Sequence, residues 1–263
     1  MTVLDDDDTV PTLDDALVAA LRAEASAPIT TVVDFGGTTA QGLIRRHNED
    51  AWGHMDQNLF VVADGMGGHA GGELAARTAV ASLLSTAASR GIVDWPAAVS
   101  RLNNQVRTAT RSRGFDRAGT ALVALSVLGG VATIVNVGDA RAYRLRGDRL
   151  VQLSTDHTVR NELIAAGIDL AEYKRRGMAL NGLTRHLGGS QSEPEVSSLV
   201  PFHDDYFLLV TDGVFRQMTE ASMIDAITGR TCQQASQRIV ELADEAGGKD
   251  NATAVVLRLG LAN

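Results

Sequence analysis

Four apolar segments of this sequence carry an aspartate at one tip. LFVVAD ends in Asp64, TIVNVGD in Asp139 and FLLVTD in Asp212. A fourth, Asp250, stands just before the apolar segment NATAVVLRL. An aspartate next to glycine is a common turn residue, so each of the four has an ordinary structural explanation. If the four tips met, however, their negative charges would repel one another unless protons or cations neutralised them.

A cluster of carboxylates favours hard divalent cations. Carboxylate oxygens suit Mg²⁺ and Mn²⁺ better than zinc, and the six histidines include no pair at the H-x-x-x-H spacing. A further acidic pair, Glu49 and Asp50, follows RRHN. The segment GMGG after Asp64 lacks most side chains, which lets backbone carbonyls approach an ion, and Gly65 is therefore a candidate carbonyl ligand. The residues alone thus suggest a Mg²⁺ or Mn²⁺ site at the tips of buried strands.

Short runs rich in β-branched residues predict the strands that must position these acids. The predicted strands cover residues 30–35, 42–46, 59–63, 120–128, 131–137, 141–145, 150–153, 206–211 and 252–258. Helical periodicity predicts helices over residues 72–89, 95–111, 159–166, 219–227 and 233–246. Strands and helices do not alternate regularly, so we expect an α+β fold with antiparallel sheets rather than a doubly wound parallel sheet.

Residues 1–27 differ in composition from the remainder of the chain. They carry seven acidic side chains and one arginine, and so most of the net charge of −8. Within them, TLDDALVAALRAEA has leucines at helical spacing, which predicts a short amphipathic helix. This helix is either loosely held or has a partner-docking or autoregulatory role. Pro28 marks the expected boundary between this acidic N-terminal extension and a single domain over residues 28–263.

The composition argues against several other classes of protein. Outside the extension the chain is nearly neutral, so we expect no nucleic-acid partner. The single cysteine, Cys232, excludes an internal disulfide and fits a reducing cytoplasm, and the acidic start lacks the positive charge of a secretory signal. Residues 120–138 are long and apolar enough to suggest a membrane span, but Gly129-Gly130 between β-branched residues predicts two strands joined by a tight turn. We therefore expect no membrane association.

Eight motifs occur in an order that is typical of one known family. They are RRHNED (45–50), ADGMGGHAGGE (63–73), GTA (119–121), VGDARAY (137–143), LSTDHT (153–158), LTRHLG (183–188), LLVTDGV (208–214) and KDNATAVVL (249–257). Over about residues 30–260 this set resembles the metal-dependent serine/threonine protein phosphatases of the 2C type, in their bacterial form. The resemblance implies a four-layer α-β-β-α sandwich with a dinuclear metal site at one edge.

The resemblance also implies a ligand set for two Mn²⁺ or Mg²⁺ ions. Asp64 would bridge the two ions, and Asp212 and Asp250 would complete the protein ligands of the first. The carbonyl of Gly65 would bind the second ion.

Other acidic residues match more peripheral positions of the family. Glu49 and Asp50 would lie near the second ion, mainly through waters, and Asp139 together with Asp212 matches the positions that hold a third, weaker ion. Asn251 would help to position the neighbouring aspartate or its waters.

The catalytic residues that the resemblance implies are Arg45, Asp64 and Asp212. Arg45 matches the arginine that binds the substrate phosphate, and a planar guanidinium suits phosphate oxygens; the adjacent Arg46 is the alternative. The implied reaction is two-metal hydrolysis of phosphoserine and phosphothreonine, in which hydroxide attacks phosphorus in line and no phosphoenzyme forms. The implied partners are phosphorylated proteins and a cognate Ser/Thr kinase, with the phosphatase acting as a monomer in the cytoplasm.

The sequence departs from the family at several positions. Met66 replaces a histidine that is proposed as the general acid in animal relatives, so the leaving group must take its proton from water or another group. His69 and His157 are candidates, although a structural role in a turn or loop explains each more simply. Ala121 and Ala140 replace residues that more often carry a hydroxyl, and we expect only modest effects.

The segment 159–182 occupies the region of the family's flap, which influences substrate choice. Its basic residues Lys174, Arg175 and Arg176 either attract phosphopeptides or form a solvated patch.

Two rival hypotheses differ in chemistry or in class. Cys232 and Arg238 fit the C-x₅-R spacing of cysteine-dependent phosphatases, but no glycine lies between them and the segment has the periodicity of an amphipathic helix. The second rival is a catalytically weak or inactive phosphatase fold that serves as a regulatory or binding module. The retained acidic residues favour an enzyme.

Overall fold

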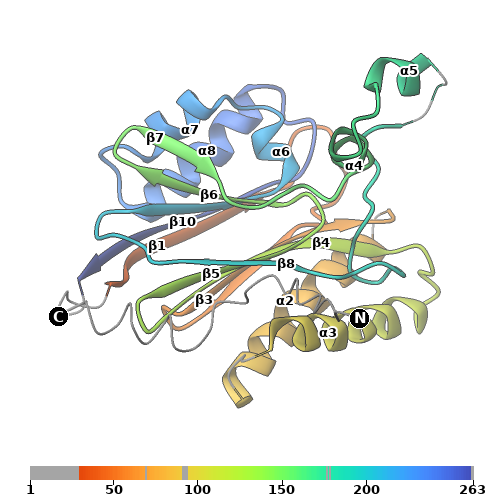
Figure 1. Ribbon diagram of the computed structural model, residues 1–263, viewed down its shortest axis with the longest axis horizontal. Coiled ribbons are helices and arrows are strands. Elements are labelled where there is room, and N and C mark those ends of the chain that lie inside the picture. The colour runs from red at the N-terminus through yellow and green to blue at the C-terminus, as the bar shows by residue number, and fades with distance from the viewer. Residues whose placement is uncertain (1–29, 69, 91–93, 176, 178, 262–263) are drawn as a thin grey trace, which may run out of the picture.

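The computed structural model describes residues 30–68, 70–90, 94–175, 177 and 179–261. Two five-stranded sheets lie face to face, and helices cover the outer face of each (Figure 1). All neighbouring strands within the two sheets are antiparallel. This four-layer α-β-β-α sandwich confirms the predicted α+β fold.

The first sheet has the order β1-β10-β9-β6-β7. Its strands are β1 (Thr30–Ala40), β10 (Ala252–Leu261), β9 (Tyr206–Val210), β6 (Arg141–Arg146) and β7 (Arg149–Gln152). Pairing of β1 with β10 runs from Thr30 opposite Leu261 to Ala40 opposite Ala252. The loop that follows β1 therefore lies beside the segment that precedes β10, and both segments carry predicted site residues.

The second sheet has the order β2-β3-β4-β5-β8. Its strands are β2 (Ala51–Met55), β3 (Leu59–Met66), β4 (Gly119–Leu128), β5 (Val131–Val137) and β8 (Glu195–Leu199). The central strand β4 pairs with β3 and β5, and the pairing with β3 places Asp64 opposite Ala121 at one end of the sheet.

Helices form the two outer layers. The helices α2 (Ala70–Arg90) and α3 (Trp95–Arg111) cover the second sheet, whereas α6 (Asp212–Phe215), α7 (Glu220–Ile227) and α8 (Cys232–Glu245) cover the first (Figure 1). The first turn of α3 is capped by Asp94, whose carboxylate accepts a hydrogen bond from the N–H of Ala97 at 2.9 Å. A capping box of Thr231 and Gln234 starts α8.

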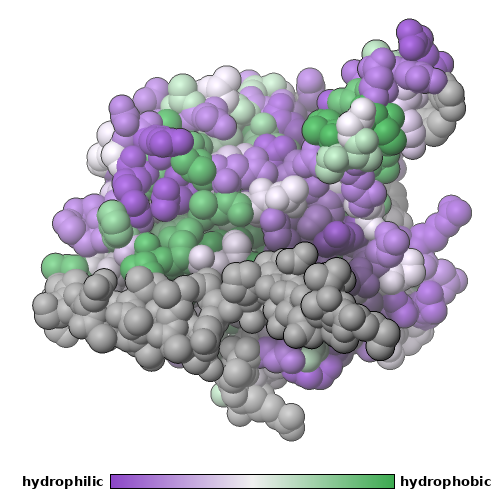
Figure 2. Space-filling model, in the orientation of Figure 1, coloured by the Kyte–Doolittle hydropathy of each residue, from purple (hydrophilic) through white to green (hydrophobic). Residues whose placement is uncertain are grey.

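The predicted flap region projects from the body of the sandwich. It contains α4 (Val159–Ala165) and α5 (Leu170–Arg175), which extend beyond the sheets at one end (Figure 1). Figure 2 shows apolar surface over α4, and Ile164 and Ile168 are 57% and 49% exposed. Lys174 and Arg175 are exposed on α5, and Arg176 lies outside the described residues.

The core has three layers because successive side chains of a strand face opposite sides. In β3, Leu59, Val61 and Ala63 pack against α2 and α3, whereas Phe60 and Val62 lie between the two sheets. A third cluster fills the space between the first sheet and the helices α7 and α8. Strands buried on both faces explain why the segments that carry the aspartates are almost continuously apolar.

The long apolar stretch over residues 120–138 is a hairpin, as predicted. Gly129 and Gly130 join β4 to β5 with φ angles of 59° and 78°, the left-handed conformation that a tight two-residue turn requires. Among the described residues, no helix is long and apolar enough to cross a membrane.

Most predicted elements are present with shifted ends, but the predicted strand over residues 42–46 is wrong. This segment is a loop, and the N–H of Leu43 donates a hydrogen bond to the carbonyl of Gly248 at 2.8 Å. Long-range bonding therefore overrides its local apolar character. The strands β2 and β8 and the short helices α5 and α6 were not predicted. The predicted N-terminal helix lies outside the described residues.

We predict that Phe207→Ala lowers the free energy of unfolding by about 3–5 kcal/mol, since it leaves a cavity between the sheets. Phe207 is fully buried in β9, the strand that leads to Asp212. Phe202→Ala is the matched control: this ring is 59% exposed and lies under the guanidinium of Arg146, so its loss should cost about 1 kcal/mol or less. Urea unfolding measures both, and equal losses would contradict the three-layer core.

Candidate metal centre

The predicted carboxylates come from both sheets and meet at one end of the sandwich. Asp64 lies in β3 and Asp139 follows β5, both in the second sheet. Asp212 follows β9 and Asp250 precedes β10, both in the first sheet. The charges of Asp50, Asp139, Asp212 and Asp250 all act on Asp64, and the charge of Asp250 also acts on Asp212. The structure therefore brings these five acids into one cluster.

Burial and mutual repulsion raise the pKa of several of these carboxyl groups. For Asp64, burial and then the charges of Asp50 and Asp212 hold the pKa well above its usual value. Burial, reinforced by Asp212, raises the pKa of Asp139 to about 6 although Arg216 opposes this. Burial also raises the pKa of Asp212. The ionised cluster is thus strained, and a bound cation would relieve the repulsion.

Asp50 is buried and fixed by two threonines. One of its carboxylate oxygens accepts hydrogen bonds from the hydroxyls of Thr211 at 2.8 Å and Thr253 at 2.6 Å. Burial nevertheless raises the pKa of Asp50 to about 7, because the hydrogen bonds offset only part of the cost of removing the charge from water. This side chain couples the segment before β2 to the ends of β9 and β10.

Gly65 lies where three chain segments approach closely. A Cβ atom at Gly65 would overlap the backbone carbonyl oxygens of Glu49 and Gly72. The carboxylate of Glu49 in turn occupies the space that a Cβ atom at Gly72 would need. Glycine at both positions is therefore what allows the start of α2, the end of β3 and Glu49 to lie together.

Asn251 holds the loop after β1 in place. Its side-chain amide donates hydrogen bonds to the carbonyls of Gln41 and His47, both at 2.8 Å, and its Oδ1 accepts one from the N–H of Glu49 at 2.9 Å. The N–H of Asn251 also donates to Asp250 at 2.9 Å. This residue thus orders the acidic loop as well as the neighbouring aspartate, a broader role than the sequence suggests.

Arg45 is placed at the cluster. Its guanidinium donates to a carboxylate oxygen of Asp250 at 2.6 Å, and 52% of the arginine side chain is exposed. Arg46 is also exposed, and no ion pair of Arg46 occurs within the described part of the chain. The structure therefore brings Arg45, and not its neighbour, to the acids.

Arg216 is a member of the cluster that sequence analysis missed. Its guanidinium donates to Asp212 at 2.8 Å and to Asp139 at 3.1 Å. The signal that was available is its spacing of four residues from Asp212, which places the two side chains on one face of a helix. That helix, α6, has only four residues and was not predicted.

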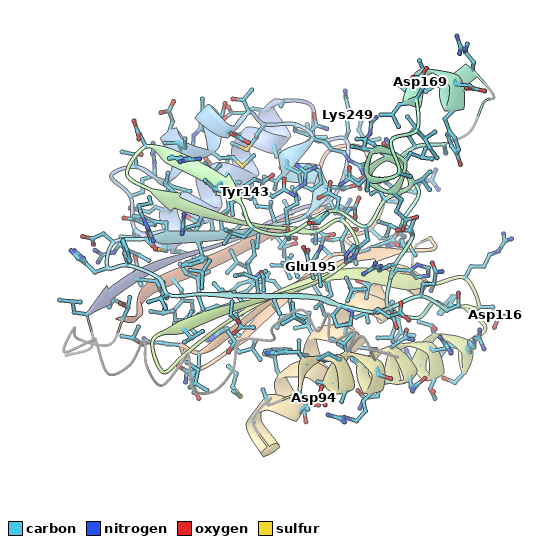
Figure 3. The ribbon with its side chains drawn as sticks, in the orientation of Figure 1. Asp94, Asp116, Tyr143, Asp169, Glu195 and Lys249 are labelled. Atoms are coloured by element: carbon cyan, nitrogen blue, oxygen red, sulfur yellow. The ribbon has the colours of Figure 1, made fainter. Side chains whose placement is uncertain are left out.

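His157 has a structural role in the loop that carries Asp139. Its Nδ1 accepts a hydrogen bond from the N–H of Gly138 at 3.1 Å, and burial lowers its pKa. Glu195 of β8 (Figure 3) accepts hydrogen bonds from the N–H and the hydroxyl of Thr155 at 2.7 and 2.8 Å. Both contacts order the segment next to Asp139.

The other departures from the family lie in or near the site. Met66 is the last residue of β3, and Ala121 and Ala140 are buried in the core between the sheets. His69 lies outside the described residues.

The cysteine-dependent alternative does not fit the structure. Cys232 is fully buried as the first residue of α8, and burial raises the pKa of its thiol, which suppresses the thiolate. Arg238 forms ion pairs with Glu241 and Glu245 on the same helix. A phosphate could not reach the buried thiol, so the two residues cannot act together in this chemistry.

The oxygen donors of the cluster fit a hard divalent cation, provided that the arginines now paired with the carboxylates move away. In the part of the chain that the structure describes, no three Asp, Glu, His or Cys side chains already have the arrangement of a metal site. Arg45 and Arg216 instead contact the carboxylates. The donors at hand are carboxylates and the carbonyl of Gly65, which suit Mg²⁺ and Mn²⁺. Burial and neighbouring negative charges raise the pKa of Asp64 and Asp139, so positive charge is favourable there.

A cavity of about 320 Å³ adjoins the cluster. Its lining includes Asp139 and Arg216 of the cluster and Arg160 and Asn181 of the flap region. The flap therefore borders the acidic cluster directly, in a position to contact whatever binds there.

We predict that the metal-free protein, kept in a chelator, becomes less stable as the pH rises from about 4 to about 7. Carboxyl groups whose pKa rises on folding, from 3.8 to about 7 for Asp50 and to about 6 for Asp139, bind more protons folded than unfolded over that interval. Their stabilisation is complete below the lower value and is lost above the higher one, a change on the order of a few kcal/mol.

Urea unfolding at several pH values measures this dependence. Asp50→Asn removes one titrating group and should flatten the profile, so the difference between the two proteins isolates Asp50. A difference of the opposite sign would contradict the assigned shift.

Comparison with known proteins agrees with this geometry. The family model for protein phosphatase 2C matches residues 43–245. A serine/threonine phosphatase from Listeria innocua is 32% identical over 244 residues, which cover 85% of this chain and 94% of that protein. The serine/threonine protein phosphatase PstP of Mycobacterium tuberculosis is 30% identical over 235 residues, which cover 88% of this chain but only 46% of the relative, so the chain spans about half of its length.

Solved structures show the same fold. The catalytic domain of PstP in complex with two manganese ions has a TM-score of 0.74 at 27% identity and covers 88% of this chain and 99% of that one. The phosphatase MsPP from Mycobacterium smegmatis, in complex with cacodylate, has a TM-score of 0.74 at 33% identity and covers 88% and 100% of the two chains. Given the matching fold and the extent of the family match, the chain belongs to the protein phosphatase 2C family.

Proposed function

We propose that this chain is a metal-dependent protein serine/threonine phosphatase that hydrolyses phosphoserine and phosphothreonine monoesters and opposes Ser/Thr kinases. The observation that carries the proposal is the convergence of Asp64, Asp139, Asp212 and Asp250 from four separate strand ends. The manganese ions in the PstP catalytic domain support Mn²⁺ or Mg²⁺ as the cofactor.

In this proposal the residues at the centre of the cluster hold the metal ions. Asp64, Asp212 and Asp250 would hold two divalent cations, with the carbonyl of Gly65 and, at longer range, Glu49 contributing to the second. When bound, such cations supply Lewis acidity and lower the pKa of water toward neutrality. Asp64 lies at the centre of the cluster, where it interacts with the other acids, which suits a carboxylate shared between two sites.

Asp50 positions the proposed metal ligands through hydrogen bonds to neighbouring residues. Its hydrogen bonds to Thr211, which precedes Asp212, and to Thr253, which follows Asp250 by three residues, fix the segments that carry these two ligands. We assign it a positioning role, with any contact to a cation passing through water.

Arg45 is suited to bind the substrate phosphate. It lies at the rim of the cluster, is half exposed, and donates to Asp250. A cation bound by Asp250 would weaken the ion pair between Asp250 and Arg45. The guanidinium would then be free to bind phosphate oxygens through two parallel hydrogen bonds. Met66 carries no proton that it could donate, so the leaving group takes its proton from water or another group.

A binding or regulatory module is the second candidate. The observation that favours it is the pairing of the carboxylates with arginines, without a preformed metal arrangement in the described residues. Absence of turnover by the wild-type protein, supplied with Mn²⁺ and either a chromogenic phosphomonoester or phosphothreonine peptides, would favour this candidate.

We predict that Asp64→Asn and Asp212→Asn each reduce turnover at least about a hundredfold, because each removes charge that the transition state depends on. Phosphate release in the presence of Mn²⁺ measures the effect, and circular dichroism checks the fold. The matched control is Asp148→Asn, an exposed aspartate in the turn between β6 and β7, at the end of β6 opposite the cluster, which should retain wild-type activity. Comparable activity in all four proteins would count against the assigned site.

We predict that Arg45→Ala lowers kcat/KM roughly ten- to a hundredfold, the value of a lost charge-assisted hydrogen bond. Arg46→Ala, one residue away, should stay within about twofold because surface charges contribute little. Steady-state kinetics on a phosphopeptide compares the two. The reverse order of effects would transfer the phosphate-binding role to Arg46.

A further inference from the structure

The proposed function leaves the charge of Arg216 without a role. Its guanidinium joins two carboxylates, with Nη1 at 2.8 Å from Asp212 and Nη2 at 3.1 Å from Asp139. The carboxylates are 16% and 9% exposed. A fixed positive charge therefore lies between the two acids for which the family resemblance implies a third metal ion.

The backbone holds this arrangement from both sides. Arg216 is the C-cap of α6, and its N–H donates to the carbonyl of Asp212 at 3.0 Å. On the other side, the loop that carries Asp139 is tied to His157 by two hydrogen bonds, from the N–H of Gly138 to Nδ1 and from the N–H of His157 to the carbonyl of Gly138. Hydrogen bonds thus hold both α6, which carries Arg216, and the loop of Asp139, so that the ion pair joins two fixed segments.

Neighbouring side chains direct Arg216 to these two acids. Asp156, the other carboxylate of the adjoining cavity, is already bound by Arg141 through two hydrogen bonds of 2.6 and 2.8 Å. The guanidinium carbon of Arg141 lies 3.6 Å from the centre of the Phe215 ring, and that of Arg216 lies 6.0 Å from the centre of the same ring. Asp156 is therefore not free to draw Arg216 away.

The cavity beside Asp139 has three arginines and two aspartates in its lining. Arg141, Arg160 and Arg216 all line it. A divalent cation at Asp139 would have to displace or closely approach the guanidinium of Arg216. Repulsion between like charges a few ångströms apart is large in a partly buried site.

We propose that Arg216 is a built-in cation that neutralises Asp139 and Asp212 and excludes a third metal ion, so that this chain binds two divalent cations and not three. The inference rests on the proposed function, because it presupposes the two ions held around Asp64. It gives Arg216 a positioning role, in which the residue orients Asp212 without contacting substrate.

The test is the number of Mn²⁺ ions bound, measured by calorimetric titration and by equilibrium dialysis with metal analysis. Wild-type protein and Arg216→Lys should bind two ions. Arg216→Ala should bind three, the third at least about tenfold more tightly than any further ion in the wild type. The double variant Arg216→Ala/Asp139→Asn should return to two, which places the added ion at Asp139.

Asp139→Asn alone gives a second measurement that does not depend on the alanine variant. It should leave the count at two, since Asp139 binds Arg216 and no metal. Three ions in the wild type, two in Arg216→Ala, or one in Asp139→Asn would each overturn the inference while leaving the proposed function intact. No binding by any of the proteins would overturn both. Circular dichroism checks the fold, and Arg216, 44% exposed, should tolerate replacement.

Discussion

The structure depends on keeping several carboxylates together at the end of a sandwich where they repel one another. Asp64, Asp139, Asp212 and Asp50 are largely buried, and the pKa of each is raised, chiefly by burial. Such a cluster opposes folding unless protons, guanidinium groups or metal ions neutralise it. The fold and the hydrogen bonds around the site keep these carboxylates in place. The proposed chemistry then uses their negative charge to bind divalent cations.

The two sheets supply the acids, and long-range hydrogen bonds fix them. Asn251 binds the loop after β1, Asp50 links that loop to Thr211 and Thr253, and His157 orders the segment around Asp139. Two arginines then distribute positive charge, Arg45 on Asp250 and Arg216 between Asp139 and Asp212. The exposed arginine at the rim is suited to exchange its carboxylate for a substrate phosphate, whereas the arginine held by α6 is suited to remain.

The sequence predicted the parts of the site that have a local signal. Each predicted aspartate lies at the tip of an apolar run, and runs buried on both faces are easy to recognise. The loop over residues 42–46 was mistaken for a strand because Leu43 and Ile44 are apolar, yet both are 68% exposed and hydrogen bonds to residue 248 set the loop's path. The edge strand β8, EVSSL, lacks an apolar run. Arg216 was missed because α6 is too short to show helical periodicity.

The most direct test of the central claim is anomalous diffraction at the manganese edge from a crystal soaked in Mn²⁺. The account predicts two strong peaks that share the carboxylate of Asp64, with Asp212 and Asp250 contacting one of them. Carboxylates that still face Arg45 and Arg216, with no peak between them, would contradict the claim that this cluster exists to bind divalent cations.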